Sequence, residues 1–384
     1  MKTIKDFDLS GKKVILRSDF NVSIKNGKII SNERITSELP TINYLVEKGA
    51  KVIIMSHLGK IKSEDDKKNN SLYIVYEELL KLLNCKVLFS SATQGPILEN
   101  KIAGLNNGEV LLMENTRYED LNNQRESKCD ENLSKYWASL GDLFINDAFG
   151  MTHRKHASNY GISKYIESGI GFLIEKEING IAPIITPTKP FTIIMSGAKL
   201  EDKLSLIQSL APKSDYLLLG GGLANTFLAV NHGIGNSLAS TDLINEVKEM
   251  LSIYKERIMI PIDVVVDANG KKEIRNVDEI KENDIIYDIG PKTIENYNSI
   301  INKSSTIFLN GTVGKYEEEQ YGEGTKQILT SVSKSAAYTV IGGGDALSSA
   351  EYYKIAGFNF VSTGGGATLN YIATGKMACF ESTK

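Results

Sequence analysis

Short apolar runs rich in β-branched residues alternate along the whole chain with longer segments that carry apolar residues at helical spacing. The first pattern is typical of buried strands, and the second is typical of helices that pack on a sheet. Regular alternation of the two favours parallel sheets with helices on both faces. We predict strands at Lys13–Leu16, Lys51–Met55, Val110–Met113, Leu143–Asn146, Phe191–Met195, Tyr216–Leu219, Ile258–Ile262, Thr306–Leu309 and Tyr338–Ile341. We predict helices at Leu39–Glu47, Leu72–Leu83, Leu133–Leu140, Lys203–Leu210 and Leu243–Ile253.

The length of the chain, 384 residues, favours two compact domains. Its 41% hydrophobic and 24% charged residues are ordinary for a globular protein. The best boundary candidate begins at Ser168, where glycines precede an amphipathic segment that is followed by a proline-bearing stretch. We therefore predict an α/β protein in which a helix separates two domains.

Charge and cysteine usage argue against several classes of protein. The net charge of −3 argues against a general affinity for nucleic acid or anionic membranes. The three cysteines are odd in number and far apart, so we expect neither a disulfide framework nor a thiolate metal site. The chain starts without a signal-peptide pattern and has no apolar run as long as a membrane span. We expect a cytoplasmic protein.

Three glycine triplets each follow an apolar run in the second half of the chain, at Gly220–Gly222, Gly342–Gly344 and Gly364–Gly366. Glycine lets the backbone approach a bulky phosphate, and the helix that follows presents free N–H groups to the anion. Three such elements in one half predict a nucleotide site built from several strand ends. The chain has neither a Walker A sequence nor a G-x-G-x-x-G fingerprint, so the site belongs to neither of those classes.

Charged residues accompany these glycines. Lys199 and Lys203 fall on one helical face after a strand, where two ammonium groups suit a phosphoryl group in transfer. Asp345 follows the second triplet, where a magnesium-bound nucleotide would need a carboxylate oxygen. Glu317 follows another glycine-bearing strand end and is placed to accept ribose hydroxyls. The plainer alternatives are a solvated helix start for the lysines, a helix cap for Asp345 and a solvated carboxylate for Glu317.

Basic residues follow the predicted strands of the first half. Ligands of open α/β sheets bind beyond the carboxyl ends of the strands, and arginine matches carboxylate and phosphate oxygens in pairs. These positions therefore predict one anion pocket, although any single arginine of this kind is more often a surface ion-pair residue. His153 and His156 lack a third ligand for a metal site. The basic residues are Arg17, Arg34, His57, Lys60, Arg117 and Arg154.

Taken together, these segments resemble the phosphoglycerate kinase family over nearly the whole chain. The resemblance implies two Rossmann-like parallel-sheet domains joined by a hinge helix, which close over the substrates. It also implies reversible phosphoryl transfer between 1,3-bisphosphoglycerate plus ADP and 3-phosphoglycerate plus ATP in glycolysis and gluconeogenesis. The matching segments are Arg-Ser-Asp-Phe-Asn-Val, Met-Ser-His-Leu-Gly, Leu-Leu-Met-Glu-Asn-Thr-Arg, Ile-Asn-Asp-Ala-Phe-Gly, His-Arg-Lys-His-Ala-Ser, Gly-Ala-Lys-Leu-Glu-Asp-Lys, Asp-Ile-Gly-Pro-Lys-Thr, Gly-Gly-Gly-Asp and Ser-Thr-Gly-Gly-Gly-Ala.

The resemblance also implies roles for individual residues, with Mg²⁺ held by Asp345 through the nucleotide. The implied catalytic residues are Arg34, Lys199, Lys203, Gly365 and Gly366. The implied substrate-binding residues are Asp19, Phe20, Asn21, Arg34, His57, Lys60, Arg117 and Arg154. The implied nucleotide-binding residues are Gly197, Ala198, Lys203, Gly221, Gly222, Gly311, Glu317, Gly343, Gly344, Asp345 and Ala346.

The same resemblance implies a domain plan. Residues 1–168 would bind phosphoglycerate, 169–184 would form the interdomain helix, 185–370 would bind the nucleotide, and 371–384 would return to the first domain. We expect a monomer that binds small-molecule substrates and neither nucleic acid nor membrane.

Several positions depart from the family pattern. The departures are Lys60 for arginine, Ser196 for glycine, Thr312 for proline, Lys315 for an apolar residue, Ile286-Tyr287 for Gly-Leu, and Ala346 for a hydroxyl residue. They leave two other hypotheses open, a kinase acting on a different anionic carboxylate and a non-catalytic binding protein. The preference for ATP or GTP stays open too.

Overall fold

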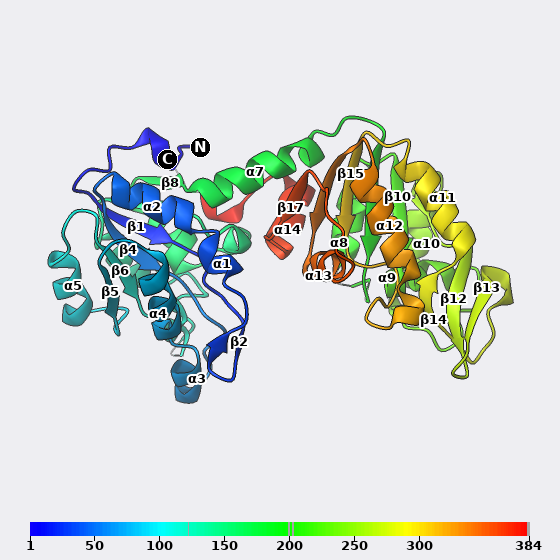
Figure 1. Ribbon diagram of the computed structural model, residues 1–384, viewed down its shortest axis with the longest axis horizontal. Coiled ribbons are helices and arrows are strands. Elements are labelled where there is room, and N and C mark those ends of the chain that lie inside the picture. Colours follow the sequence, from blue (N-terminus) through cyan, green and yellow to red (C-terminus); the bar gives the residue numbers. More distant parts are fainter. Residues whose placement is uncertain (122, 199, 202, 382–384) are drawn as a thin grey trace. The chain divides into compact units, whose positions relative to one another are not determined.

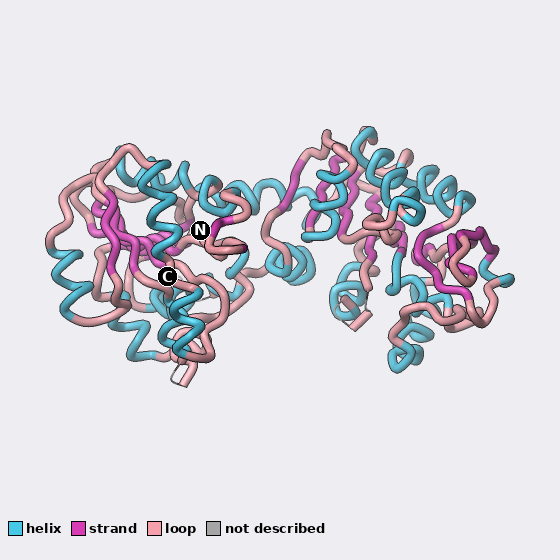
Figure 2. The backbone as a smooth tube through the Cα atoms, turned by 60° about the horizontal axis from the view of Figure 1, so that its bottom comes forward, coloured by secondary structure: helices cyan, strands magenta, loops and turns pink. Residues whose placement is uncertain are grey.

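A computed structural model describes residues 1–121, 123–198, 200–201 and 203–381. The chain forms two compact units, the first from Met1–Ile178 with the segment from Lys376 onward, and the second from Asn179–Gly375 (Figure 1). Each unit contains a parallel sheet with helices around it (Figure 2). Helix α7, Phe172–Ile185, contains the boundary between the units.

The first unit is built on a six-stranded sheet in the order β5-β6-β4-β1-β7-β8, with every pair of neighbours parallel. Its strands are β1 (Lys13–Arg17), β4 (Lys51–Met55), β5 (Val87–Ser90), β6 (Val110–Met113), β7 (Leu143–Asn146) and β8 (Ser168–Ile170). A short hairpin follows β1 and pairs β2 (Ile24–Lys25) with β3 (Lys28–Ile29). Its helices are α1 (Glu33–Thr36), α2 (Leu39–Glu47), α3 (Glu64–Asn69), α4 (Tyr73–Leu82), α5 (Pro96–Ala103) and α6 (Glu131–Ala138).

Both faces of this sheet are buried, as the alternation of side chains in its strands requires. On β1, Leu16 packs into one apolar cluster and Ile15 into another on the opposite face. The first cluster includes residues from α2 and α4, and the second includes Trp137 from α6. Consecutive strand residues therefore serve two cores, which explains why the strands are apolar throughout.

The second unit repeats this plan with a sheet in the order β11-β10-β9-β15-β16-β17, again entirely parallel. Its strands are β9 (Phe191–Ser196), β10 (Tyr216–Gly220), β11 (Ile258–Met259), β15 (Thr306–Asn310), β16 (Tyr338–Gly342) and β17 (Phe360–Ser362). A separate antiparallel sheet joins β12 (Asp263–Ala268) to β13 (Lys272–Asn276) and β14 (Asp284–Ile289). Its helices are α8 (Leu204–Leu210), α9 (Gly221–Leu228), α10 (Ile244–Tyr254), α11 (Pro291–Ile301), α12 (Glu323–Lys334), α13 (Gly344–Tyr352) and α14 (Gly366–Thr374).

The C-terminal segment packs on the first unit. The backbone N–H of Cys379 donates to the carbonyl of Thr152 at 3.0 Å, and the Lys155 ammonium pairs with Glu381 at 2.6 Å. The buried Cys379, like Cys85 and Cys129, is a free thiol. The segment that ends the chain therefore contacts the loop after β7.

The α/β class and the parallel sheets predicted from the sequence are confirmed. All nine predicted strands are present in the two large sheets, although β11 is shorter than expected, and all five predicted helices are present within two residues at each end. The sequence pattern missed the edge strands β5, β8 and β17 and the antiparallel sheet, whose strand β13 is largely polar. Because Ser168–Ile170 forms strand β8, helix α7 begins at Phe172, later than expected.

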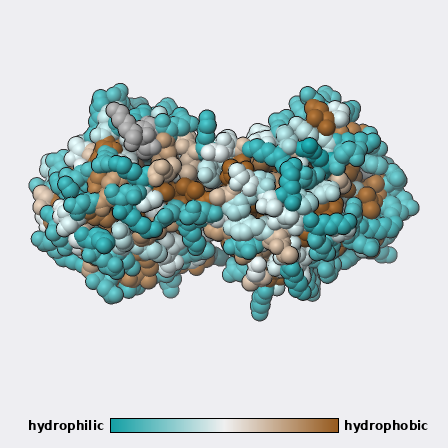
Figure 3. Space-filling model, turned by 90° about the horizontal axis from the view of Figure 1, so that it is seen from above, coloured by the Kyte–Doolittle hydropathy of each residue, from teal (hydrophilic) through white to brown (hydrophobic). Residues whose placement is uncertain are grey.

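The surface is polar where the sheets and their apolar cores are covered by helices. The face seen in Figure 3 is mainly hydrophilic, with scattered apolar residues. Within the described part of the chain, no helix has the length and apolar character needed to span a membrane.

The single tryptophan, Trp137, is fully buried and reports on the first unit. Ile53 packs in the same apolar cluster as Trp137. We expect Ile53→Ala, which leaves a cavity in that cluster, to lower the free energy of unfolding by about 2–5 kcal/mol. Urea unfolding followed by Trp137 emission measures this change. Ile97→Ala is the matched control, because Ile97 is 57% exposed and its loss should cost about 0.5 kcal/mol or less. Equal effects of the two variants would contradict this account of the core.

Candidate active site

Polar and basic residues converge at the carboxyl edge of the first sheet. Strands β1, β4, β6 and β7 are neighbours and run parallel, so the segments that follow them emerge at one edge. Helix α1 supplies Arg34, and the turn Thr116–Asp120 after β6 supplies Arg117. The predicted substrate-binding residues at this edge are Asp19, Phe20, Asn21, Arg34, His57, Lys60, Arg117 and Arg154.

Asp19 is the most connected of these residues. Its carboxylate pairs with the Arg34 guanidinium, and its backbone N–H donates to Oε1 of Glu38 at 2.9 Å. Burial alone would raise the pKa of Asp19, but neighbouring cationic groups, including Arg34 and Arg17, lower it. The carboxylate therefore stays ionised, and it orients Arg34, whose side chain is 45% exposed and reaches solvent.

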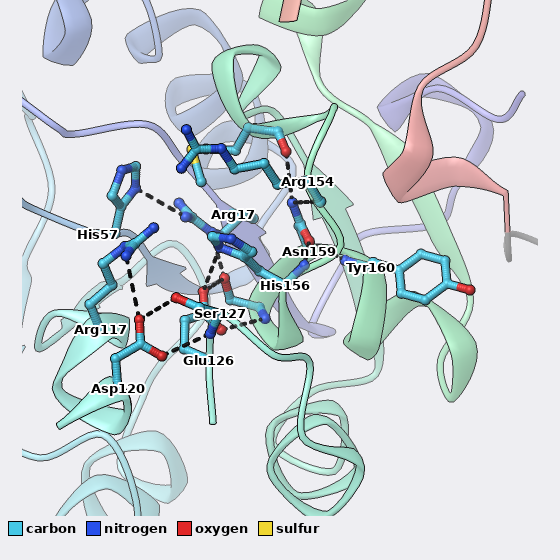
Figure 4. Close-up of polar contacts among 12 residues, drawn as sticks. Arg17, His57, Arg117, Asp120, Glu126, Ser127, Arg154, His156, Asn159 and Tyr160 are labelled. Carbon is cyan, nitrogen blue, oxygen red and sulfur yellow. Dashed lines mark hydrogen bonds and ion pairs between the residues drawn. The ribbon is translucent and has the colours of Figure 1, made fainter. Parts of the chain in front are cut away.

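A fully buried arginine lies behind this edge. Figure 4 shows Arg17 between His57 on one side and the Glu126 region on the other. The Arg17 guanidinium donates to Oγ of Ser158 at 2.8 Å and contacts Nδ1 of His57 at 3.2 Å. The Ser158 hydroxyl and backbone N–H both donate to the carboxyl of Glu126, which has no solvent exposure. The buried cation thus lies in a network that ends on a buried carboxyl group.

This network determines the protonation state and the tautomer of His57. Burial, with smaller contributions from Arg17 and Arg117, lowers the pKa of His57 to about 3 against the opposing effect of Asp19. The ring is therefore neutral at physiological pH. Because a guanidinium can only donate, Nδ1 of His57 accepts, and the ring proton resides on Nε2. His57 is a neutral hydrogen-bond donor for a ligand at this edge.

Unpartnered polar atoms surround the same edge. Arg117 and His156 are each more than nine-tenths buried. Nε of Arg117 and Nδ1 of His156 have no hydrogen-bond partner among the described residues. Such groups are costly unless a ligand or water pairs with them. Arg117 also lines a surface hollow with Lys60, Lys62 and Lys128. The arrangement fits a multiply charged anion.

The remaining predicted residues of this edge differ in what they offer a ligand. Asn21 is exposed, and its side-chain oxygen accepts the N–H of Gly59 at 2.9 Å. Arg154 is exposed and donates to Nε2 of His153 at 3.1 Å. The Phe20 ring is fully buried in the core, and its N–H donates to Ser56, so the side chain has no route to a ligand. Among the described residues, no group of three His, Cys, Asp or Glu side chains is placed to hold a metal.

Glycine-bearing segments converge at the carboxyl edge of the second sheet. Strands β10, β9, β15, β16 and β17 are successive parallel neighbours, so the segments after them share one edge. Helices α9, α13 and α14 begin there. The predicted residues at this edge are Gly197, Ala198, Lys203, Gly221, Gly222, Gly311, Glu317, Gly343, Gly344, Asp345, Ala346, Gly365 and Gly366, whereas Lys199 lies outside the described residues.

Lys203 is the central charge of this edge. Its ammonium donates to the Ser196 carbonyl and, at 2.5 Å, to Oδ1 of Asn310. Glycine makes room for it, because a Cβ on either Gly197 or Gly311 would lie 3.3 Å from Nζ. The ends of β9 and β15 therefore hold the ammonium where their glycine loops meet.

The glycines of this edge have two different physical roles. A Cβ on Gly222 would lie 2.2 Å from the Ala198 carbonyl, and one on Gly343 would lie 2.5 Å from Nδ2 of Asn310, so these glycines let neighbouring loops pack. A Cβ on Gly344, Gly365 or Gly366 would meet nothing within 4 Å. These last three, at the starts of α13 and α14, leave open space for a ligand beside free N–H groups.

Apart from Lys60, the positions that depart from the family pattern lie in this unit. Tyr287 and Ile286 line a narrow cavity of about 10 Å³ with Gly221 and Val313. The Lys315 ammonium lies 4.5 Å from the centre of the Tyr287 ring, and Tyr321 packs against the same ring at 4.8 Å. Two departures, Lys315 and Tyr287, are thus in contact. Ala346 is fully buried, while Asp345 and Glu317 are exposed.

A family model described as phosphoglycerate kinase matches residues 4–376. The chain belongs to the phosphoglycerate kinase family. Phosphoglycerate kinases of Lactobacillus gasseri and Fusobacterium nucleatum are each 44% identical to it, over 96% and 97% of this chain and 95% and 96% of theirs. A solved phosphoglycerate kinase structure from Coxiella burnetii matches with a TM-score of 0.90 at 31% identity, over 100% of this chain and 98% of that one. The predicted family and two-sheet fold are confirmed, and the chain is a phosphotransferase that uses ATP and ADP.

Sequence reasoning missed several residues that support the first edge. Glu126 and Ser158 hold Arg17 in place, and Glu38 holds the backbone of Asp19. Their functional neighbours lie far away in the chain, so spacing alone carries no signal for them. Arg17 offered one clue, because a charged residue at the end of a buried strand needs a buried partner.

The histidines of this edge predict a specific pH behaviour. Burial lowers the pKa values of both His57 and His156 to about 3. Because these two histidines then bind more protons in the unfolded chain than in the folded chain between roughly pH 6.5 and pH 3, their contribution to stability must fall as the pH falls through that window. Nitrogen NMR of the histidine rings should show both neutral at about pH 5, with the His57 proton on Nε2. Imidazolium signals from either ring at that pH would contradict this assignment.

Proposed function

We propose that the chain catalyses reversible phosphoryl transfer between 1,3-bisphosphoglycerate plus ADP and 3-phosphoglycerate plus ATP. One observation carries the proposal. Two parallel sheets present two chemically different edges, one with arginines and neutral histidine donors and the other with glycine-lined helix starts and an ammonium group. The first suits an anionic carboxylic acid, and the second suits a polyphosphate.

The first edge would bind the phosphoglycerate. Arg117 and Arg154 would pair with its phosphate, with Lys60 as a further cation, and His57 would donate from Nε2. Asp19 and Asn21 would accept hydroxyl hydrogens. Asp19 also keeps Arg34 oriented, so that Arg34 can reach the acceptor carboxylate and the phosphoryl group.

The second edge would bind the nucleotide. The cavity at Gly221, Tyr287 and Val313 would open to take the base, and Glu317 would accept from the ribose. The starts of α13 and α14 would donate N–H groups to the phosphates. The exposed Asp345 fits a magnesium ion carried by the nucleotide, because Mg²⁺ commonly takes one or two carboxylates beside substrate phosphates and water. When bound, that ion neutralises charge on the phosphate oxygens.

The chemical step would be a direct in-line transfer. In the ATP-consuming direction, a carboxylate oxygen of 3-phosphoglycerate forms a bond to the γ-phosphorus while the bond to the β,γ-bridging oxygen breaks, and ADP leaves with that electron pair. Lys203 and Arg34 would offset the charge on the equatorial oxygens, and the N–H groups beside Gly365 and Gly366 would bind the same oxygens. Positioning and charge stabilisation would supply the catalysis.

In this proposal the first compact unit binds phosphoglycerate and the second binds the nucleotide, so one chain carries every group the reaction uses. We propose a monomer for that reason, and analytical ultracentrifugation measures the oligomeric state. A cytoplasmic location fits the three free cysteines.

Lys203→Met tests the role of the ammonium group. We expect kcat to fall by about 10²–10³-fold, the usual effect of removing one donor to a developing charge. A coupled assay with 3-phosphoglycerate and ATP measures the change. Lys334→Met, an exposed lysine of α12, is the matched control and should leave kcat unchanged. A similar kcat in the wild type and Lys203→Met would remove Lys203 from the mechanism.

A panel of acceptors tests the substrate. Lys60 and the hollow that it lines with Lys62 and Lys128 favour a phosphorylated acid over glycerate, which lacks the phosphate. We expect kcat/KM for 3-phosphoglycerate to exceed that of any other carboxylate by at least about tenfold, or about 1.4 kcal/mol in the transition state. A different preferred carboxylate would instead support the kinase acting on another acid. Running the panel with ATP and GTP settles the purine preference.

A further inference from the structure

Glu38, which lies between α1 and α2, is a fully buried carboxyl group directly behind the first edge. Its Oε1 accepts the backbone N–H of Asp19 at 2.9 Å. Its Oε2 is buried and has no hydrogen-bond partner within the described part of the chain. One oxygen of Glu38 thus fixes the backbone of the residue that orients Arg34, and the other is free to carry a proton.

Asp147, directly after β7, is a second fully buried carboxyl group, and it holds the start of α7. Its Oδ1 accepts the N–H of Ile174 at 2.9 Å, and its other oxygen accepts the hydroxyl of Thr41. That hydroxyl in turn accepts the N–H of Phe172 at 3.0 Å. A Cβ on Gly171 would lie 2.3 Å from the Asp147 carboxyl carbon, so the chain enters the helix directly against this group.

Printed contacts aside from their own hydrogen bonds hold the two carboxyl groups in one region of the first unit. Thr41, three residues after Glu38, donates to Asp147, and the backbone N–H of Asp147 donates to the carbonyl of Arg17 at 2.9 Å, two residues before the Asp19 N–H that Glu38 accepts. Burial raises the pKa of Glu38 well above its usual range, and the Asp147 charge raises it further. Burial also raises the pKa of Asp147, to about 7. The other charged groups that face the pair are Arg17 and Asp19 beside Glu38, and Glu175 of α7 beside Asp147. Arg17 is the single cation among them and is already bound to Ser158 and His57.

We propose that Glu38 and Asp147 share one proton near neutral pH, and that Glu38 is thereby a positioning residue that makes binding of the acidic substrate depend on pH. The proposal rests on the function proposed above. Two neighbouring buried carboxylates cannot both ionise without strong repulsion. Loss of the shared proton would push Glu38 away from Asp147. The backbone of Asp19, and with it Arg34, would move from the arrangement that receives the ligand.

Glu38→Gln mimics the protonated pair. The amide oxygen can still accept the Asp19 N–H, while the amide nitrogen occupies the place of Oε2 and carries no charge at any pH of the experiment. We expect the Kd for 3-phosphoglycerate, measured by calorimetry, to rise at least about threefold in the wild type between about pH 6 and about pH 8.5. In Glu38→Gln, the change in Kd beyond the change caused by titration of the ligand itself should be less than about 1.5-fold. That titration is common to both proteins and cancels in their ratio.

Unfolding measurements test the shared proton without any ligand. The raised pKa values mean that the folded pair binds more protons than the unfolded pair, so its stabilising effect is complete at acid pH and is lost as the pH rises from about 4 through about 7. As the pH rises over that window, the wild type should therefore lose unfolding free energy relative to Glu38→Gln and to Asp147→Asn. Glu109→Gln is the matched control, because hydrogen bonds from the backbone and side chain of Asn106 lower the pKa of Glu109 to about 2, below this window.

The two experiments separate the possible failures. Equal pH profiles of Kd in the wild type and Glu38→Gln would overturn the positioning role. Equal pH slopes of stability in the wild type and both carboxyl variants would overturn the shared proton. Turnover of another acid, with no binding of 3-phosphoglycerate at any pH, would overturn the proposed function instead, and the Kd profile would then be measured with that acid.

Discussion

The parallel register of the two large sheets is the constraint on which the rest of the structure depends. Because all strands of a sheet point the same way, every segment that follows a strand emerges at one edge. Residues as distant in sequence as Asp19 and Arg154 therefore belong to one edge, as do Lys203 and Asp345 in the second unit. Side chains alternating into two apolar cores hold this register, since a slip by one residue would exchange the faces.

The two edges differ in the groups that they could offer to an anion. The first places cations in the interior, and these need buried partners such as Glu126 behind Arg17. The second relies on backbone N–H groups at helix starts, with Lys203 held by a carbonyl and an amide oxygen. Removing a supporting carboxyl group would therefore disturb the positions of the cations at the first edge. Adding a side chain at an open glycine such as Gly366 would instead fill the space beside the helix starts at the second.

Sequence alone predicted nine strands of the two large sheets, five helices and the interdomain helix, the family, and the edge to which each basic or glycine-rich segment belongs. Those features depend on local periodicity or on contiguous motifs. It did not predict the Arg17–His57 contact, the carboxyl groups of Glu38 and Asp147, or the burial of Phe20. These depend on side chains brought together from remote segments in the folded interior, where no spacing rule operates. In the antiparallel sheet, β13 is largely polar and has no apolar run, whereas β12 and β14 carry short apolar runs that were not predicted as strands.

The central claim is that each sheet edge binds its own substrate. Hydrogen–deuterium exchange of the intact chain with either ligand alone tests it most directly. We predict that 3-phosphoglycerate slows exchange in the segments after β1, β4, β6 and β7 and leaves the second unit unchanged. Magnesium and ADP should slow exchange after β9, β10, β15, β16 and β17 and leave the first edge unchanged. Protection of the same segments by both ligands, or of each edge by the opposite ligand, would contradict the account.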